Sequence, residues 1–553
     1  MQRVRIMVLG GLSEDGKNMA VIEIDQDIFV VDCGLKYPNS EQLGVQCIIP
    51  DFTYILENKD RVKAVLITHG HDDVMAALGY LLQEADLPVY ATPLTAKILG
   101  RQFDALGIRN KHVNILRRNS DITIAGHKIH TFSVTQSIPD CIGIAFETEN
   151  GQIVYSSEFI FDYDSLNESF QMDFPTLSRI GSKKVLALLG ESVGAHRIGY
   201  TSPRHRITPA IDRYFEAENG RFFITLYKQN LYRIFEVLEL AKKYKRRIYF
   251  TEDEQRRILQ DVEQLGYYKI PSSLILNKKD FDNSLQDLII IVSGSGNEVF
   301  RRMNRIAIGD DRDIELSRDD AVIIASPVVP GTEKEAANME DDLYIAGVRV
   351  LKIGKEQAYS MHASQEDLKM MLNILKPEYY IPVKGEYRSL VANAEVATAA
   401  GYLPNRIVIL DNGQFADFSD GHLVSTHEVL ELNDTLIDGK DKLDVTGMVL
   451  KDRETLSTDG AIVLGIVLNF ETKKVIGGPD VQSRGVIYLK DADYILEEVG
   501  KILIDSVEEA VREGRYDNMK VRAEAKEKIS RYIAKQTGKR PMILPAIVEI
   551  SEA

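Results

Sequence analysis

The stretch ITHGHDDVMAAL, at residues 67–78, carries the strongest structural and chemical signal in this chain. It starts inside the apolar run AVLIT (64–68), which has the composition of a buried strand, and passes through His-Gly-His-Asp-Asp into a helical pattern. Two imidazoles and one or two carboxylates at a strand end can converge on one point, and they suit zinc or another borderline divalent ion. The alternative is a solvated polar turn that happens to contain two histidines.

Strand-length apolar runs surround this stretch throughout residues 1–207. Examples are RVRIMVL (3–9) and VLALLG (185–190), whereas segments with a helical pattern are few. The rhythm changes at residue 208, because strands such as FFITLY (222–227) then alternate with helices as far as residue 350. Such alternation requires crossover connections, so residues 208–350 are predicted to form a separate doubly wound domain with a parallel sheet.

The remainder of the chain divides into three segments. Residues 351–420 resume a β/α pattern, which either continues the second domain or returns to the first, and 421–446 are expected to be a linker. A further unit is predicted at 447–553. Its main features are the apolar run AIVLGIVLNF (461–470), a long helical stretch (493–535) with a brief break near residue 514, and the strand-like MILPAIVEI (542–550).

Composition limits the classes of function. A chain of 553 residues exceeds what one hydrophobic core usually serves. A net charge of −16 argues against a surface built for nonspecific nucleic-acid binding, although an acidic exterior can surround a basic cleft. No segment approaches the run of about 18 apolar residues that crosses a bilayer, so no membrane partner is expected. Three cysteines (Cys33, Cys47 and Cys141) are too few for a disulfide framework and indicate buried thiols in the cytoplasm.

Several blocks resemble a known family. HGHDD resembles the HxHxDH motif of metallo-β-lactamase-fold hydrolases, and VVDCGLKYP (30–38) resembles the acidic strand end that precedes it, with Asp32 as a supporting carboxylate. Four further blocks resemble ribonuclease J specifically: SIPDCIGI (137–144), KGEYR (384–388), GPDVQSRG (478–485) and KRPMILP (539–545). The resemblance implies an α/β fold, namely an αββα metallo-β-lactamase sandwich with an inserted doubly wound β-CASP domain (208–350). It also implies that 351–420 returns to the sandwich and that 447–553 is a small α/β domain of the dimerisation type.

The resemblance also implies a chemistry, in which two metals hold a hydroxide that attacks an RNA phosphodiester. The family has metal ligands at seven positions of this chain. Three keep their identity: His69, His71 and Asp73. One is changed conservatively, since Glu158 in SSEFIFD stands where the family has Asp. The other three are family histidines that are substituted here: Val74, Gln136 and Lys384.

Physical reasons rank these substitutions. Valine cannot ligate a metal, and a lysine ammonium is repelled by a divalent cation. Val74 and Lys384 both fall on the metal that Asp73 and Glu158 would serve, so we expect that site to be empty. Lys384 can instead supply the missing positive charge by pairing with Asp73 or Glu158. The other site keeps His69 and His71 but gains Gln136, a poor zinc ligand, so it is expected to hold at most one weakly bound Zn²⁺, Mn²⁺ or Mg²⁺, or none.

Further positions carry over with mixed identity. Glu191 stands where the family has an acidic residue after a strand, and His362 stands where the family has a histidine near the scissile phosphate. Together with Asp73 they are the predicted catalytic residues. The alternative for Glu191 is a helix cap or surface carboxylate, and for His362 a satisfied interior histidine. Two segments are predicted to bind substrate: QNLYR (Gln229, Asn230, Leu231, Tyr232, Arg233) and AYSMH (Ala358, Tyr359, Ser360, Met361, His362). The basic run PRHR (203–206) either contacts RNA or is a solvated face.

The resemblance therefore predicts a ribonuclease J-type protein of RNA processing and decay, with weak or absent metal-dependent 5′-to-3′ exoribonuclease and endoribonuclease activity. Whether it is an enzyme is left open. The alternative is a catalytically inactive RNA-binding subunit that partners an active ribonuclease J paralogue. The expected partners are RNA and either a second copy of the chain or that paralogue. A small-molecule hydrolase is disfavoured, because generic metallo-β-lactamase enzymes lack the C-terminal blocks.

Overall fold

The structure is a computed structural model that describes residues 2–39, 42–109, 111–217, 220–439, 441–442, 448–486 and 493–551. The chain forms two compact units. The first comprises Met1–Asn39 and Gln46–Ile437, and the second comprises Ser40–Val45 and Asp438–Ala553. Among the described residues, no helix has both the length and the apolar character that a membrane span requires.

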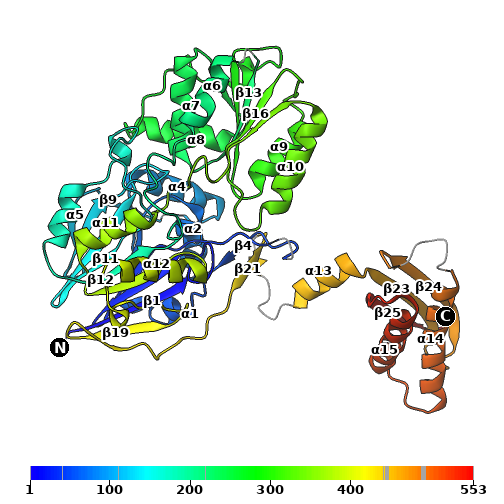
Figure 1. Cartoon of the computed structure of the whole chain (residues 1–553). Coiled ribbons are helices and arrows are strands. Elements are labelled where there is room, and N and C mark those ends of the chain that lie inside the picture. Colours follow the sequence, from blue (N-terminus) through cyan, green and yellow to red (C-terminus); the bar gives the residue numbers. More distant parts are fainter. Residues whose placement is uncertain are drawn as a thin grey trace. The chain divides into compact units, whose positions relative to one another are not determined.

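Two sheets packed face to face form the base of the first unit (Figure 1). The eight-stranded sheet contains, in spatial order, β20 (His422–Ser425), β19 (Phe415–Ser419), β1 (Arg3–Gly10), β2 (Met19–Ile24), β3 (Asp27–Val31), β5 (Val62–Ile67), β6 (Val89–Ala91) and β7 (Val113–Ile115). The six-stranded sheet contains β18 (Tyr379–Val383), β12 (Val185–Glu191), β11 (Gly151–Tyr155), β10 (Ile142–Thr148), β9 (His127–Ser133) and β8 (Asp121–Ile124).

The side-chain alternation of β1 shows why these sheets are buried on both faces. Ile6 and Val8 point into the core between the two sheets, whereas Met7 and Leu9 point into the core beneath the helices. Helices cover both outer faces: α1 (Thr53–Glu57), α2 (Asp72–Met75), α3 (Leu78–Glu84), α4 (Pro93–Ala105), α5 (Phe174–Gly181), α11 (Gln365–Leu375) and α12 (Tyr387–Ala399). The predicted αββα sandwich is thereby confirmed.

A third sheet belongs to the same unit and is drawn in green in Figure 1. Its five strands all run parallel in the order β14 (Arg247–Phe250), β15 (Leu288–Gly294), β13 (Phe222–Tyr227), β16 (Ala321–Ile324) and β17 (Arg349–Lys352). Helix α6 (Thr208–Ala217) precedes these strands in the chain, and the helices between them are α7 (Leu231–Lys243), α8 (Asp253–Gln264), α9 (Glu298–Ala307) and α10 (Glu333–Ala346). This is the doubly wound domain that the strand–helix alternation predicts.

The segment after this domain returns to the sandwich, which decides between the two alternatives that the sequence left open. β18 pairs in parallel with β12, and β19 pairs antiparallel with β1. The expected linker at 421–446 needs correction, because β20 extends the large sheet and β21 (Thr435–Asp438) pairs with β4 (Cys47–Ile49). These strands have four residues or fewer and few apolar side chains, so their pattern is too weak to recognise in sequence. The expected boundary at residue 447 lies outside the described residues.

The second unit is a three-stranded sheet with helices on one face. Its strands are ordered β24 (Val475–Arg484), β23 (Ala461–Asn469) and β25 (Met542–Ile550), and α14 (Asp493–Arg512) and α15 (Asn518–Thr537) cover one side. A shorter helix, α13 (Met448–Thr458), precedes the sheet. Strand β23 alternates strictly, since Ile462 and Leu464 are buried beneath the helices while Val463 is 49% exposed on the other face.

Candidate metal centre

The carboxyl ends of strands from both sheets bring the predicted site residues together. β5 leads into His69, His71 and Asp73, β9 into Gln136, β11 into Glu158, and β18 into Lys384, while Glu191 is the last residue of β12. The turn after β5 is held by backbone pairing with the end of β3, because Cys33 N–H donates to Val74 O at 2.7 Å. A Cβ on Gly34 would lie 1.6 Å from Asp73 O, so this close approach requires glycine.

Three of these residues form a cluster suited to a metal ion. His69 Nε2 lies 3.3 Å from Glu158 Oε2 and 3.1 Å from His71 Nδ1, and His71 Nδ1 lies 3.7 Å from the same carboxylate oxygen. Within the part of the chain that the structure describes, these are the one group of three or more His, Cys, Asp or Glu residues whose ligand atoms all lie within 4.8 Å of one another. Two imidazoles and a carboxylate are the protein ligand set of many catalytic zinc sites.

A hydrogen-bond chain fixes the orientation of His69. Thr68 Oγ1 donates its single proton to Asp32 Oδ1 at 2.8 Å, so it must accept from the Nδ1–H of His69 at 3.0 Å. The His69 Nε2 lone pair therefore points at His71 and Glu158, as in metal-binding histidines whose other nitrogen donates to a supporting group. Burial and the neighbouring His71 lower the pKa of His69 to about 3, which keeps the ring neutral.

Lys384 occupies the interior of this site as a cation. Its Nζ lies 3.2 Å from Glu158 Oε1 and 3.6 Å from Asp32 Oδ2, and its side chain is only 4% exposed. Burial opposes the charge, but the carboxylates, with Glu158 the strongest, raise the pKa of Lys384 well above its ordinary value. Burial likewise opposes ionisation of Glu158, yet Lys384 holds the pKa of that carboxyl well below its usual range. Of the two partners considered for Lys384, the structure therefore selects Glu158.

Val74 and Gln136, the other two substituted positions, do not serve as metal ligands, and Asp73 is engaged in a hydrogen bond. Val74 is fully buried in the core beneath the helices. Gln136 uses its Nε2 to donate to Glu158 Oε2 at 2.7 Å, the oxygen that faces the histidines. Asp73 accepts from Asn18 Nδ2 at 2.8 Å, and burial together with Glu158 raises its pKa to about 7. The donor set of His69, His71 and Glu158 thus fits one metal ion, whereas the position between Asp73 and Glu158 does not fit a second.

Glu191 and His362 form an ion pair beside this centre, in which Glu191 is buried and His362 is 21% exposed. Glu191 Oε2 lies 2.8 Å from His362 Nδ1, and its Oε1 accepts from the backbone N–H groups of Phe159 and Ala363. Burial works against the imidazolium, but Glu191 raises the pKa of His362 to about 9, so the ring is cationic at neutral pH. Glu191 is therefore no surface carboxylate. A catalytic role for the pair stays a prediction.

The segment Gln229–Arg233 lies mostly in the interior. Gln229 Nε2 donates to Asp72 Oδ1 at 2.7 Å, and Asn230 caps α7 by accepting from Arg233 N–H. Leu231 and Tyr232 are fully buried.

This burial revises the roles expected for Tyr232 and Arg233. Tyr232 donates its hydroxyl to Asp162 at 3.1 Å, so its ring is not available to stack on a base. Arg233 is also buried, and its guanidinium donates to the backbone carbonyls of Ala325, Ala358 and Tyr359. Both side chains stabilise the junction of the inserted domain and the sandwich, because the packing there leaves them no open side.

The segment Ala358–His362 is more open. Ala358 and Met361 are buried, whereas Tyr359 is partly exposed and Ser360 is exposed. Arg197 holds this segment from outside, since its guanidinium donates to the carbonyls of Ser360 at 3.0 Å and His362 at 2.6 Å. Ser360 and Tyr359 are thus the members that present polar atoms or a ring edge to solvent.

The sequence carries no chemical signal for several residues that shape the site. Asn18 bonds Asp73 at 2.8 Å and belongs to no recognisable motif. Ser137 opens the block SIPDCIGI, and only the structure shows that its hydroxyl lies 3.0 Å from His71. Asp72, the first carboxylate of the motif, lies outside the metal cluster and accepts from Tyr37 and Ser295 as well as from Gln229. It therefore joins the inserted domain to the sandwich at the edge of the site.

Four family models match the chain, in the same order as the structural parts. They are the metallo-beta-lactamase superfamily (residues 12–195), the ribonuclease J beta-CASP domain (219–343), the Zn-dependent metallo-hydrolase RNA specificity domain (350–409) and the ribonuclease J C-terminal domain (448–550). A zinc-dependent family agrees with a divalent ion at the cluster of His69, His71 and Glu158.

Curated relatives match over nearly the whole chain. The chain is 33% identical over 550 residues to Ribonuclease J 2 of Staphylococcus aureus (strain NCTC 8325), covering 99% of this chain and 98% of the relative. It is 32% identical over 549 residues to Ribonuclease J 2 of Staphylococcus epidermidis (strain ATCC 35984), with the same coverage. A crystal structure of a protein of unknown function from Enterococcus faecalis V583 shares the fold, with a TM-score of 0.51, 13% identity, and coverage of 75% of this chain and 100% of that one.

Proposed function

The chain belongs to the ribonuclease J family, whose work is RNA processing and decay, and we propose that it binds RNA while its own nuclease activity is weak or absent. One observation carries the proposal: the Lys384 ammonium lies 3.2 Å from Glu158, where two-metal catalysis needs a second divalent ion. A fixed cation at that position neutralises the carboxylate. It does not activate a water molecule, because it is not a Lewis acid with an exchangeable ligand.

The remaining centre supports at most one weakly held ion. His69, His71 and Glu158 would hold it, and it would supply a Lewis acid that stabilises charge on a phosphoryl oxygen. Three observations favour weak binding. Glu158 Oε2 already accepts from Gln136, Glu158 Oε1 is paired with Lys384, and zinc prefers four strong ligands. The cationic His362 offers a second positive charge to an RNA phosphate that reaches this edge.

A nuclease and binding assay tests this proposal on the full-length chain. Single-stranded RNA with a 5′ monophosphate is incubated with the wild type and with the His69→Ala/His71→Ala variant, with manganese and then with EDTA. We expect RNA binding by both proteins under both conditions, and slow turnover confined to the wild type with metal. Turnover that is equal in the two proteins would come from a contaminant. Wild-type turnover near the typical enzyme rate of about 10 s⁻¹ would overturn the proposal, and so would absence of RNA binding.

A second function, that of a subunit partnering a second copy or an active ribonuclease J paralogue, is favoured by the free face of the C-terminal sheet. Val463 on β23 pairs with Leu544 on β25, and Val548 lies on the same face of β25; these residues are 49%, 46% and 53% exposed. Adjacent aliphatic side chains on one sheet face mark a contact surface for another protein. We therefore infer that this face forms the oligomer contact.

Point variants test the contact without truncating the chain. Leu544→Lys together with Val548→Lys should lower the molecular mass measured by light scattering, alone or with the paralogue. Ile543→Lys, on the buried face of the same strand, should unfold the domain instead. An unchanged mass in the first variant would refute the placement.

The three cysteines form no disulfide and are buried. Free thiols are typical of a reducing compartment, so we infer that the protein works in the cytoplasm.

A further inference from the structure

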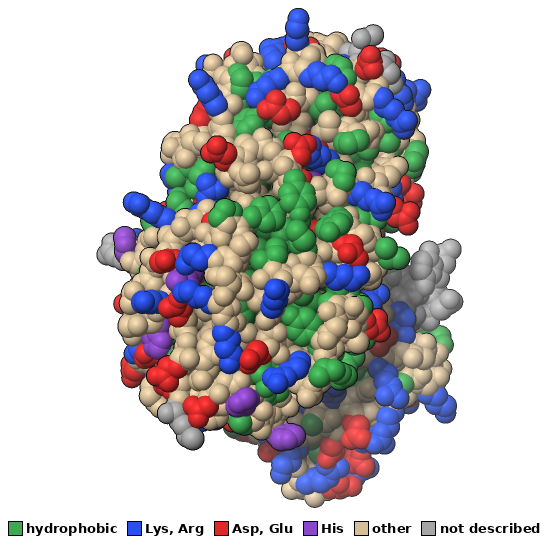
Figure 2. Space-filling model, turned by 60° about the vertical axis from the view of Figure 1, so that its left-hand side comes forward, with side chains coloured by type: hydrophobic (Ala, Val, Ile, Leu, Met, Phe, Trp, Pro, Cys, Tyr) green, Lys and Arg blue, Asp and Glu red, His purple; other side chains and the backbone are tan. Residues whose placement is uncertain are grey.

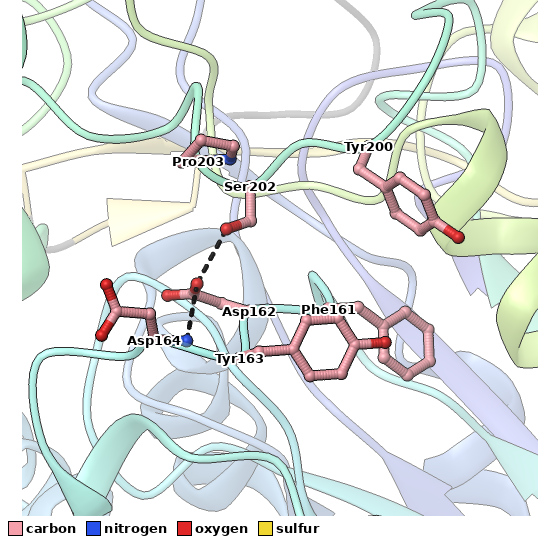
Figure 3. A pocket seen from close by; sticks show the side chains of 7 residues that line it. All are labelled: Phe161, Asp162, Tyr163, Asp164, Tyr200, Ser202 and Pro203. Atoms are coloured by element: carbon pink, nitrogen blue, oxygen red, sulfur yellow. Dashed lines mark hydrogen bonds between the residues drawn. The ribbon is translucent and has the colours of Figure 1, made fainter.

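A pocket lies between the loop after β11 and the loop that leads into α6. Its volume is about 300 Å³, and none of its lining residues belongs to the candidate metal centre. Figure 3 shows the aromatic side chains Phe161, Tyr163 and Tyr200 on one side and the polar side chains Asp162, Asp164 and Ser202 on the other. The pocket therefore combines flat apolar surfaces with hydrogen-bonding groups at one edge.

The aromatic side is built but not filled by the protein. Tyr163 stacks one face on Phe174, with ring centroids 5.5 Å apart and an interplanar angle of 7°, yet it remains 70% exposed. Tyr200 is 44% exposed. Partial burial of Tyr163 raises the pKa of its hydroxyl, and the nearby Tyr200 raises it further. A ring supported from behind and open in front can accept a planar ligand with little loss of side-chain freedom.

The polar side has one buried carboxylate, Asp162, and one exposed carboxylate, Asp164. Asp162 is buried and accepts from Ser202 Oγ at 2.7 Å, so its carboxylate is held in place in the pocket lining. The Asp164 side chain is 93% exposed, and its single partner among the described ion pairs is Arg206 at 3.3 Å. Arg204, in the same basic run, is exposed and donates to the hydroxyl of Tyr359. Arg206 also lies 3.7 Å from Asp162, so the two carboxylates balance its charge. Arg204 directly follows Pro203 of the pocket lining and is the exposed cation of this run.

We infer that this pocket is a binding site for one unpaired nucleotide of single-stranded RNA, outside the metal centre. The base stacks on Tyr163 and Tyr200, Asp164 accepts from an exocyclic amino group, and Arg204 contacts a neighbouring phosphate. Aromatic platforms with adjacent cations are the usual means by which proteins hold single strands. The inference deepens the proposed function and rests on it, since it assumes that RNA is the ligand of this protein.

The charges favour RNA over a peptide. A basic peptide would suit the tyrosines and Asp164, but the exposed Arg204 would repel it. An RNA strand gains from that same guanidinium group. Figure 2 shows one face of the molecule, on which hydrophobic side chains gather near the middle and charged side chains of both signs lie around them. Asp164 also predicts selectivity, because cytosine presents an amino donor where uracil presents a carbonyl oxygen.

The experiment measures binding of oligo(C) and oligo(U), ten nucleotides long, to the full-length chain by fluorescence anisotropy. Tyr163→Ala and Tyr200→Ala should each weaken oligo(C) binding about 5- to 100-fold, the range expected for loss of one stacking platform. Tyr163→Phe keeps the ring and should bind as the wild type does. Tyr344→Ala removes a similarly exposed tyrosine on α10 and serves as the matched control. Asp164→Asn should reduce the preference for oligo(C), because an amide can also donate to uracil.

The outcomes separate the two proposals. A wild type that binds neither RNA refutes the proposed function, and the pocket assignment falls with it. A wild type that binds RNA while the Tyr163 and Tyr200 variants match the Tyr344 control refutes the pocket alone. An oligo-arginine peptide whose binding, unlike that of RNA, is lost in Tyr163→Ala would identify a protein-docking site and would also overturn the inference. Because Tyr163 is largely exposed, its variants should fold, which circular dichroism verifies.

Discussion

Replacing Lys384 by methionine tests the central feature of the site, a buried ammonium in place of a metal. The change keeps the side chain's length and apolar stem but removes its charge. Glu158 and Asp32, which lie 3.2 and 3.6 Å from the ammonium, then remain buried without that cation. Breaking a buried ion pair by removing one partner typically costs about 3–5 kcal/mol, and two affected carboxylates place the expected loss in that range.

A matched pair of variants isolates this effect. Lys183→Met removes a lysine that pairs with Glu147 at 2.6 Å but is 51% exposed, so it should cost about 0–1 kcal/mol. Adding Glu158→Gln to Lys384→Met removes one stranded carboxylate and should restore part of the lost stability. The double-mutant cycle then gives the coupling between the two residues. Urea unfolding of five proteins, followed by circular dichroism at pH 7, supplies the free energies: the wild type, Lys384→Met, Glu158→Gln, the double variant and the Lys183→Met control.

The pH dependence of the free energy of unfolding provides a second, independent test. In the wild type the pKa of Glu158 is depressed, so its contribution to stability is present above the unfolded value, about 4.3, and is lost as pH falls through the folded value. In Lys384→Met, burial without the cation should raise the pKa of Glu158, so lowering the pH relieves the destabilisation. The gap between the two proteins should therefore narrow from pH 7 to pH 4.5. A loss below 1 kcal/mol at pH 7, or a gap independent of pH, would refute the reasoning.

Three further predictions follow from neighbouring contacts. Val74→His combined with Lys384→His should raise the bound metal, measured by elemental analysis, to two ions per chain; no gain over the wild type would count against the assignment of these positions. Because Glu191 raises the pKa of His362 to about 9, that pair stabilises the fold fully below pH 6.5 and loses its contribution as pH rises toward 9. Glu191→Gln should flatten this dependence in melting curves, by about 1–3 kcal/mol, and a slope equal to that of the wild type would exclude the pairing. Asp72→Ala removes the acceptor shared by Tyr37, Ser295 and Gln229, so limited proteolysis at the junction with the inserted domain should accelerate; equal rates would show that this contact does not hold the junction.

Much of the architecture could be predicted from local sequence. Strand-length Val/Ile runs, the strand–helix alternation over 208–350 and the helices near 493–535 depend on periodicity, which neighbouring residues set by themselves. β20 and β21 could not be predicted in this way, because such short strands exist only through pairing with β19 and β4. Their hydrogen-bond partners are hundreds of residues away or separated by a turn, and local composition carries no trace of them.

At the candidate metal centre, too, the sequence determined some features and only the tertiary structure decided others. By itself the sequence determined which groups are present: histidines at 69 and 71, a valine at 74 and a lysine at 384, and hence that one metal position had lost its ligands. Only the tertiary structure decided where the lysine's charge goes. β18 and β11 flank β12 and run parallel to it, so their carboxyl ends lie at the same edge of the sheet. Lys384 therefore pairs with Glu158 rather than with Asp73. The same packing buried Tyr232 and left Tyr163 open, because exposure depends on what the rest of the chain places against a side chain.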